Sequence, residues 1–286
     1  GCAPSSFSLT CTKLLSMVAF GLIASDGRLA TLRQIDIQSH IVDFSARVTI
    51  SQVYLNETDQ VFEVRYVFPL PDSAAVCTFK AQVDDKVVEG VVKKRDEAKE
   101  IYEEAKSHGA PAMLLEEQED DIFVCQIGNL APGKSCRIEI SYVQEQSIDG
   151  VVLSDGFAGD HMRFTLPMVV APRYDPSPTD VSTLPSRGPA EDLPYRFRLA
   201  IALTLLTPIR AVTSPSHAIV CTSLPSTDTH QCRAEVKLAT GCGHLDRDFV
   251  MLVEQDKSSS SAARAVVEHN SKTGLCALQV TFCPPD

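Results

Sequence analysis

The chain has 286 residues, of which 44% are hydrophobic, and its formal net charge at pH 7 is −11. This length exceeds that of most single domains, so two domains are expected, each with its own apolar core. The acidic balance argues against a surface that neutralises phosphates, and we therefore expect no binding to nucleic acid.

The N-terminal part of the chain carries a short apolar segment. Lys13 precedes the apolar residues 14–24, which have the length of a signal-peptide core. The segment is too short, and too interrupted by glycine, to cross a bilayer. No membrane span is therefore expected.

Residues 42–92 show the alternation of apolar and polar side chains that is typical of β-strands. Strands are predicted at 42–50, 62–68 and 77–83, where every second residue is apolar. Pro69 ends the second of these because proline lacks a backbone N–H. Asp84 and the aspartate after it predict a hairpin turn that leads into residues 86–92.

One helix is predicted, over residues 95–108. Its apolar side chains recur at helical spacing and form one stripe: Ala98, Ile101, Tyr102 and Ala105. Gly109 is well placed as the C-terminal cap. We expect this stripe to cover the apolar face of a sheet.

An acidic run follows the predicted helix. Its carboxylates belong to Glu116, Glu117, Glu119, Asp120 and Asp121. Such a run is typical of a solvated loop, but it also offers a surface to a basic protein. We therefore take these five residues as a candidate partner surface.

The rest of the pattern predicts two sandwiches and a mainly β fold. A strand at 123–127, a turn at 128–133 and a strand at 136–142 complete an antiparallel β-sandwich domain over residues 17–172. Residues 173–194 are rich in Pro and Ser and lack periodicity, which predicts a linker or a long loop. Alternation then resumes, and a second, smaller β-sandwich is expected at residues 195–286.

Four motifs occur in a fixed order along the first predicted domain. They are Y-x-F-P-L-P at 66–71, A-A-V at 74–76, A-x-x-x-Y-x-x-A-x-x-x-G at 98–109 and F-x-C-x-x-G-N-L-A-P-G at 123–133. Together they resemble the VIT domain, the module shared by vault poly(ADP-ribose) polymerase and the inter-alpha-trypsin inhibitor heavy chains. The resemblance implies a β-sandwich with one inserted helix and a role as an interaction module. It implies no reaction.

The resemblance also implies what lies around this module. A von Willebrand factor A domain is expected to follow, so the chain is expected to be a fragment whose second sandwich is incomplete and has an open edge. Met17 resembles the start of cytosolic family members, which would make residues 1–16 an N-terminal extension. The alternative is a signal peptide and secretion.

Three groups of residues could carry chemistry, and none is expected to do so. Asp256–Ser260 has the D-x-S-x-S pattern of a metal-dependent adhesion site, but the helix and distant ligands of such a site are missing, so a loop is predicted. Cys125 lies near the acidic run, which would raise the pKa of its thiol. A zinc site is not expected because the spacing is wrong in the set Cys221, His230, Cys232, Cys242 and His244.

The sequence therefore favours a non-enzymatic protein–protein interaction or scaffold module. We expect no catalytic, cofactor-binding or metal-binding residues and no cofactor. The expected partners are a protein of unknown identity and the adjacent von Willebrand factor A domain.

The cysteines and the sequon at Asn56 bear on the compartment and the subfamily. The ten cysteines are scattered without a C-x-x-C motif, which favours reduced thiols and a cytoplasmic location, with several thiols (Cys77, Cys136 and Cys283) buried in strands. One alternative is a secreted matrix protein resembling the inhibitor heavy chains, which could be glycosylated at Asn56. The other is a non-catalytic part of a vault polymerase.

Overall fold

The computed structural model describes residues 21–71, 73–84, 86–90, 115–119, 122–152, 158–168, 195–226, 231–240, 247–256, 264–269, 271 and 273–281. Every regular element in these ranges is a β-strand, which confirms the predicted mainly β fold. Three predicted segments lie outside the described residues: the extension at 1–16, the helix at 95–108 and the linker at 173–194.

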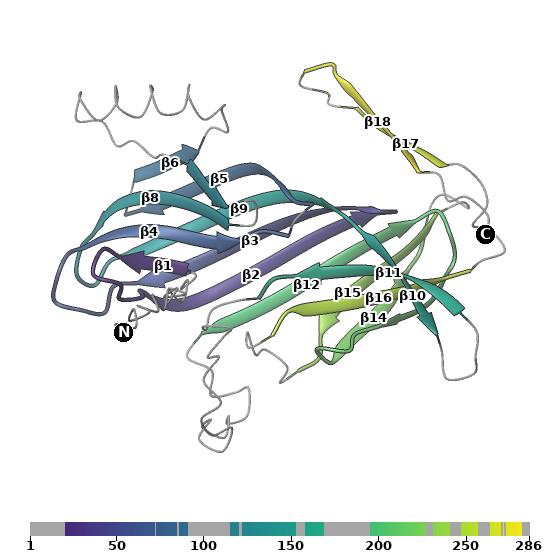
Figure 1. Cartoon of the computed structure of the whole chain (residues 1–286), viewed down its shortest axis with the longest axis horizontal. Coiled ribbons are helices and arrows are strands. Elements are labelled where there is room, and N and C mark those ends of the chain that lie inside the picture. Colours follow the sequence, from purple (N-terminus) through teal and green to yellow (C-terminus); the bar gives the residue numbers. More distant parts are fainter. Residues whose placement is uncertain are drawn as a thin grey trace, which may run out of the picture.

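One long sheet runs through the molecule (Figure 1). Its eight strands are, in spatial order, β14 (Ile219–Leu224), β15 (Cys232–Leu238), β12 (Arg196–Leu205), β2 (Thr31–Val42), β3 (Ser45–Leu55), β9 (Ser135–Glu145), β5 (Ala75–Val83) and β6 (Lys86–Gly90). Neighbouring strands are antiparallel except β2 and β12, which are parallel from Gln34 opposite Arg196 to Val42 opposite Thr204. Strands from both predicted domains therefore share this sheet.

Two four-stranded sheets lie over the two ends of the long sheet (Figure 1). The first is β1 (Gly21–Ala24), β4 (Phe62–Pro69), β8 (Ile122–Leu130) and β7 (Leu115–Glu119), and the second is β10 (Ser147–Val152), β11 (Ala158–Leu166), β16 (Phe249–Gln255) and β13 (Ile209–Thr213). In the second sheet, β11 pairs with β16, so residues before 172 again pair with residues after 195. The division into domains at 17–172 and 195–286 stays a prediction.

Aromatic side chains fill the space between the first sheet and the long sheet. The ring centroids of Phe68 on β4 and Tyr142 on β9 are 6.3 Å apart, and those of Phe79 on β5 and Phe123 on β8 are 5.1 Å apart. All four rings are buried. Aromatic pairs at such separations add to the large apolar area that each ring removes from water. This half of the molecule is therefore a sandwich with a continuous core.

The predicted alternation is confirmed on β9 and corrected at the start of β3. On β9, Cys136, Ile138, Ile140 and Tyr142 are all buried. The strand predicted at 42–50 is instead the end of β2, a turn, and β3. Asp43 has a φ of 48°, a left-handed conformation that aspartate tolerates better than most residues, and it turns the chain between Val42 and Ser45, which pair with each other.

Two β-bulges correct other details of the prediction. The register of β5 and β9 shifts between Val76 and Thr78, so Cys77 is exposed instead of buried. The register of β4 and β8 shifts near Gly128, whose φ is 106°. Because glycine adopts this conformation easily, β8 continues to Leu130, and the turn predicted at 128–133 is confined to the residues after it.

Asp43 also connects the β2–β3 turn to the residues at the end of β12. Its Oδ1 accepts a hydrogen bond from the Leu206 N–H at 3.0 Å, and its own N–H donates to the Thr204 carbonyl at 3.1 Å. The side chain is buried, and its Oδ2 atom has no hydrogen-bond partner. The hydrogen bonds hold the β2–β3 turn against the end of β12, where the parallel pair finishes.

The substitution Asp43→Ala should lower the free energy of unfolding by about 2–3 kcal/mol, because it leaves the Leu206 N–H unpaired and places alanine at a positive φ. Asp43→Asn keeps an acceptor oxygen and a tolerated conformation, so it should cost less than about 1 kcal/mol. Urea unfolding monitored by circular dichroism measures both. Equal losses would show that the hydrogen bond does not stabilise the fold.

Three buried tyrosines should make the fold sensitive to alkali. Burial raises the pKa of Tyr54, Tyr66 and Tyr142 above the ordinary value near 10. The folded chain therefore keeps protons that the unfolded chain releases. The buried thiols of Cys125 and Cys136, whose pKa burial also raises, act in the same direction from about pH 9. Stability should therefore fall above about pH 9, by up to about 1.4 kcal/mol per pH unit for each of these five buried groups.

Urea unfolding midpoints measured between pH 9 and 11.5 test whether stability falls as the pH rises. Tyr142→Phe should reduce the slope by about a fifth, as one of five such groups. It should cause no loss at pH 7, because the buried Tyr142 hydroxyl has no hydrogen-bond partner among the described residues. A midpoint that does not move across this range would contradict the prediction.

Candidate functional site

The acidic run predicted as a partner surface forms an edge strand. Glu116, Glu117 and Glu119 lie on β7, the last strand of the sheet β1-β4-β8-β7, whereas Asp120 and Asp121 lie outside the described residues. Residues 115–119 are therefore a strand and not the loop that the run of charges suggested. Their role as a partner surface stays a prediction.

Strand β7 is placed by the first half of β8, where the neighbouring side chains of Phe123 and Val124 are both buried, one on each face. Glu116 pairs with Val124 and Glu117 with Phe123, and a bulge follows before Glu119 pairs with Ile122. Phe123 belongs to the main core, and Val124 belongs to a second small cluster with Ile23 and Val67. Because β8 is fixed by these contacts, the backbone of β7 has a rigid support on one side. Its other side faces no described strand.

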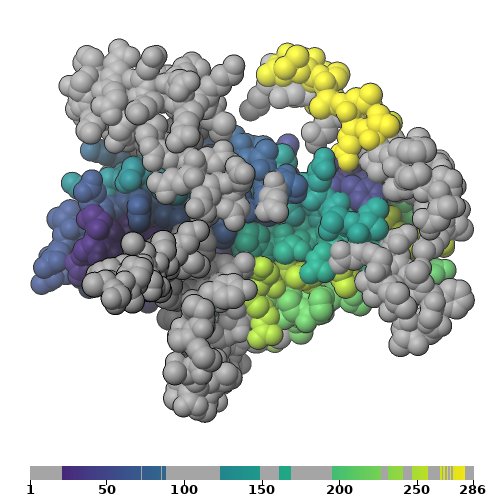
Figure 2. Space-filling model, in the orientation of Figure 1, coloured from purple at the N-terminus to yellow at the C-terminus, as the bar shows by residue number. Residues whose placement is uncertain are grey.

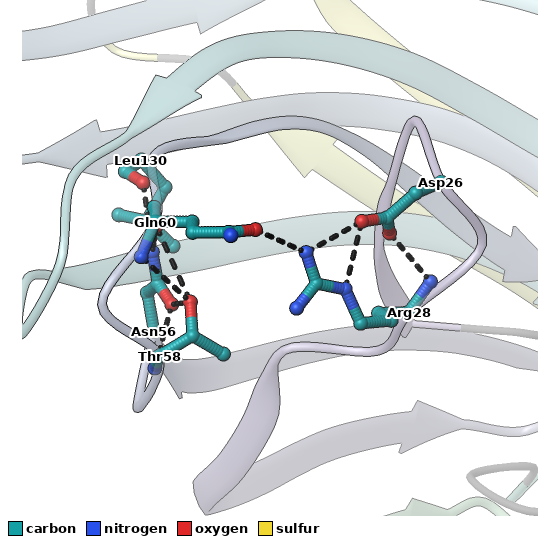
Figure 3. A network of polar contacts seen from close by, with 6 residues as sticks. All are labelled: Asp26, Arg28, Asn56, Thr58, Gln60 and Leu130. Carbon is teal, nitrogen blue, oxygen red and sulfur yellow. Dashed lines mark hydrogen bonds and ion pairs between the residues drawn. The ribbon is translucent and has the colours of Figure 1, made fainter.

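A polar network next to this sheet involves the possible glycosylation site (Figure 3). Asn56 is fully buried, and its Nδ2 donates to the carbonyls of Gln60 at 2.7 Å and Leu130 at 3.0 Å. Its Oδ1 accepts from the backbone N–H of Thr58 at 3.0 Å and from the Thr58 hydroxyl at 2.8 Å. A glycan on Nδ2 would remove a donor and need space inside the fold, so modified Asn56 is incompatible with this structure.

The same network connects two loops through Arg28. Its Nε donates to Asp26 Oδ2 at 2.7 Å, and its Nη2 donates to Gln60 Oε1 at 3.0 Å. Its guanidinium lies 4.6 Å from the centre of the Phe62 ring. These contacts orient the loop after β1 against the loop before β4. Asparagine and threonine are common in turns, but this composition alone does not indicate the network.

The thiols of the described cysteines show no sign of activation. Cys125 and Cys136 are buried, and desolvation raises the pKa of the Cys136 thiol to about 12 and the pKa of the Cys125 thiol well above its ordinary value. Burial, and not the acidic run, is thus the main cause at Cys125. A thiol that stays protonated at neutral pH is a poor nucleophile.

The two other candidate groups are only partly described. Cys221 pairs with Val236, and Cys232 pairs with Leu205, so the two cysteines lie four positions apart on neighbouring strands. That offset is about 13 Å, too far for both to bind one zinc ion. The backbone N–H of Asp256 donates to the Pro208 carbonyl at 3.0 Å at the end of β16. The remaining members of both groups (His230, Cys242, His244 and 257–260) lie outside the described residues.

Searches of the described residues add two findings. They contain no cluster of three or more His, Cys, Asp or Glu side chains arranged to hold a metal ion. They also contain no helix that is long and apolar enough to cross a membrane.

Alkylation should separate the described cysteines by burial. In the folded protein at pH 7.5, iodoacetamide should modify the exposed Cys77 and Cys276, because alkylation needs an accessible thiol. Cys125 and Cys136 should react only after denaturation. Peptide mapping by mass spectrometry measures both states, and rapid labelling of Cys125 in the native protein would contradict its inert assignment.

Comparison with known proteins identifies a domain family. Residues 32–142 match the family described as "Vault protein inter-alpha-trypsin domain". The chain is 31% identical over 278 residues to "von Willebrand factor A domain-containing protein 5A" from Rattus norvegicus, covering 93% of this chain and 32% of that protein. It is 29% identical over 276 residues to the protein of the same name from Mus musculus, covering 92% of this chain and 33% of that protein. The chain thus spans about a third of the length of these relatives.

A second relative matches only part of the chain. "Protein mono-ADP-ribosyltransferase PARP4" from Homo sapiens is 36% identical over 146 residues, covering 51% of this chain and 8% of that protein. An M1 zinc metallopeptidase from Deinococcus radiodurans superposes with a TM-score of 0.37 at 9% identity over 91% of this chain and 47% of that chain, which supports no argument about function. The match from β2 to β9, together with these relatives, shows that the chain carries a vault protein inter-alpha-trypsin (VIT) domain at residues 32–142.

Proposed function

We propose that this chain is a non-enzymatic protein–protein interaction module and that its acidic edge strand β7 is the surface for a protein partner. The observation that carries the proposal is that three glutamates lie on the last described strand of the sheet β1-β4-β8-β7. An edge strand offers unpaired backbone groups, and an added strand from a partner can pair with them.

The charge of β7 determines which partner fits. Glutamates on an edge strand disfavour pairing between two copies of the same strand, because like charges would lie close together. They favour a partner that brings lysine or arginine, and the net charge of −11 attracts such a partner over a longer range. We therefore propose a basic, extended segment as the ligand.

The extent of similarity favours one organisation of the whole protein. The similarity to the von Willebrand factor A domain-containing proteins extends over 92–93% of the chain and therefore includes strands after residue 195. The similarity to the ADP-ribosyltransferase covers only 51% of the chain. We propose that the module adjoins a von Willebrand factor A domain, as the names of the former relatives suggest for them. It then acts as a scaffold beside that domain.

The buried thiols support the non-enzymatic part of the proposal. The described part of the chain contains two thiols in its core, and burial holds both in the protonated form. No disulfide joins the described cysteines to one another. We also propose a cytoplasmic location, since cysteines without disulfides and a buried sequon asparagine suit a reducing compartment. Native disulfides, or a glycan on Asn56, in protein isolated without reductant would overturn this location.

Neutralising the edge strand tests the partner surface. In the triple variant E116Q/E117Q/E119Q, capture of the bound partner should fall about tenfold or more, because three charges are removed from one contact. The melting temperature should change by no more than about 2 °C, since surface substitutions seldom affect stability. Affinity capture of the full-length protein from cells, quantified by mass spectrometry, measures how much partner binding is lost.

A matched variant controls for the overall charge. The triple variant D59N/E63Q/E145Q removes three carboxylates from exposed residues outside β7. It should leave capture unchanged. Equal losses for both variants would show that total charge, and not β7, decides binding, and no loss for either variant would refute the proposed surface.

A further inference from the structure

Five of the six edge strands in the three large sheets carry a feature that discourages further pairing. Strand β1 is only four residues long, and β7 and β13 contain bulges. Strand β6 contains Lys86 and Glu89, and β10 contains Asp149 and Gly150. Short length, charge and bulges are the means by which natural edges avoid unwanted strands.

Strand β14 is the exception among these described edges. Its sequence, IVCTSL, has no charged residue, no proline and no glycine, and its register with β15 is regular from Ile219 to Leu224. Val220 is 53% exposed, and Cys221 is exposed as well. A regular, uncharged and partly apolar edge is suited to receive another strand.

The same chain contains a hairpin that joins none of the three large sheets. Among the described strands, β17 (Arg264–His269) and β18 (Cys276–Thr281) pair only with each other. Val267, Leu278 and Val280 are 64%, 66% and 61% exposed. Figure 2 shows this hairpin, in yellow, at the outer margin of the molecule. An isolated two-stranded hairpin is marginally stable in water, so this one needs a further contact.

The three exposed side chains lie on one face of the hairpin. Val267 is opposite Leu278, and Ala265 is opposite Val280, so these four residues form an apolar patch. The patch would be buried from solvent if the hairpin extended a sheet that has an apolar inner face.

The hairpin is within reach of β14. The Asp256 N–H bonds to the Pro208 carbonyl, which places the end of β16 beside the connection from β12 to β13, three residues past the end of β12. Leu205 pairs with Cys232, and Leu224 pairs with Arg233, so β14 ends at that same end of the sheet, about 10 Å away across two strand spacings. Residues 257–263 separate Asp256 from β17 and span up to roughly 25 Å when extended.

This placement also sets the direction and the register of pairing. A strand that starts beside Leu224 and runs toward Ile219 is antiparallel to β14, the commoner arrangement. Both β14 and β17 are six residues long. With full overlap, Cys221 lies opposite Val267, and Ser223 lies opposite Ala265. Cys221 shares its face of the sheet with its partner Val236, which is buried in the core.

We propose that hairpin β17–β18 adds to the open edge of β14, with β17 antiparallel to β14, so that the apolar patch extends the inner face of the long sheet. The full-overlap register brings the patch to that face, whereas a shift by one residue would turn it to the outer face. The occupant of the β14 edge is thus a segment of this same chain. The inference does not depend on β7 or its partner.

Disulfide trapping tests the pairing. In the full chain with Cys77 and Cys276 replaced by serine, the variant V267C should form a disulfide with the native Cys221 under mild oxidation by copper–phenanthroline. Directly opposite residues have Cα separations that a disulfide can bridge. L278C is the matched control, because it lies on the same face but one strand farther from β14. Peptide mapping should find at least about tenfold more of the first disulfide than of the second.

The other outcomes each contradict the proposal. Preferential trapping by L278C would place β18, not β17, against β14. A disulfide-linked dimer on a non-reducing gel would show that a second copy supplies the hairpin. No trapping with either variant would leave the β14 edge without the proposed occupant.

Hydrogen exchange provides a test without added cysteines. In the unmodified chain, the β14 amides that do not bond to β15 should exchange slowly if β17 covers them. The double variant V267D/L278D should expose them and raise their exchange at least about tenfold, with unchanged protection of β15 as the sign that the sandwich is intact. Exchange that is already fast in the unmodified chain would overturn the proposal.

Discussion

The parallel contact between β2 and β12 is the constraint on which the rest of the structure depends. It joins Gln34–Val42 to Arg196–Thr204, so residues far apart in the sequence become neighbours in the middle of one sheet. Without it, each half of the long sheet would end in an exposed edge, and neither four-stranded sheet would have a complete partner. Non-local pairing of this kind orders a long stretch of chain, and its entropic cost must be offset by the cores on both sides.

The end of that contact is also where a charged side chain is buried. The Asp43 carboxylate accepts the Leu206 N–H while its second oxygen is unpaired, an arrangement that is favourable only because the turn needs a positive φ and the N–H needs an acceptor. A buried polar group of this kind favours the one arrangement in which its hydrogen bond is made, because every other arrangement leaves buried groups unpaired. Tyr66 is a similar case: its hydroxyl donates to Gln52 Oε1 at 2.6 Å inside the first sandwich and fixes β4 against β3.

The sequence alone could reveal most strands but not how they pair. Alternation on β9 was visible because Ile138 and Ile140 face the core while Arg137 faces water. Alternation has a period of two in every strand, so it does not say that β12 lies beside β2 or that β11 lies beside β16. The motifs at 66–133 supplied the family, because order and spacing of several motifs are more specific than any periodicity.

The prediction failed where local backbone geometry interrupts the alternation. Cys77 is exposed because a bulge shifts the register by one residue, and a single inserted residue has no signature in composition. Residues 115–119 are a strand although charge favoured a loop, because pairing with the buried β8 outweighs the low strand propensity of glutamate. The partner surface itself could be suggested from the charges, but its position at a sheet edge could not.

Two of the described sheet edges, β7 and β14, differ in charge and in regularity, and this difference supports the roles that we propose for them. A charged edge such as β7 resists strands like itself and accepts only a segment with complementary charge, so it suits a specific external partner. A neutral, regular edge such as β14 accepts any strand with a matching apolar face, which is a hazard unless the chain supplies that strand itself. A hairpin held by a short connection is present at a high effective concentration and would exclude competing strands from β14. The edge that we propose for recognition of other proteins is then β7, where the charges would provide the selectivity that backbone pairing lacks.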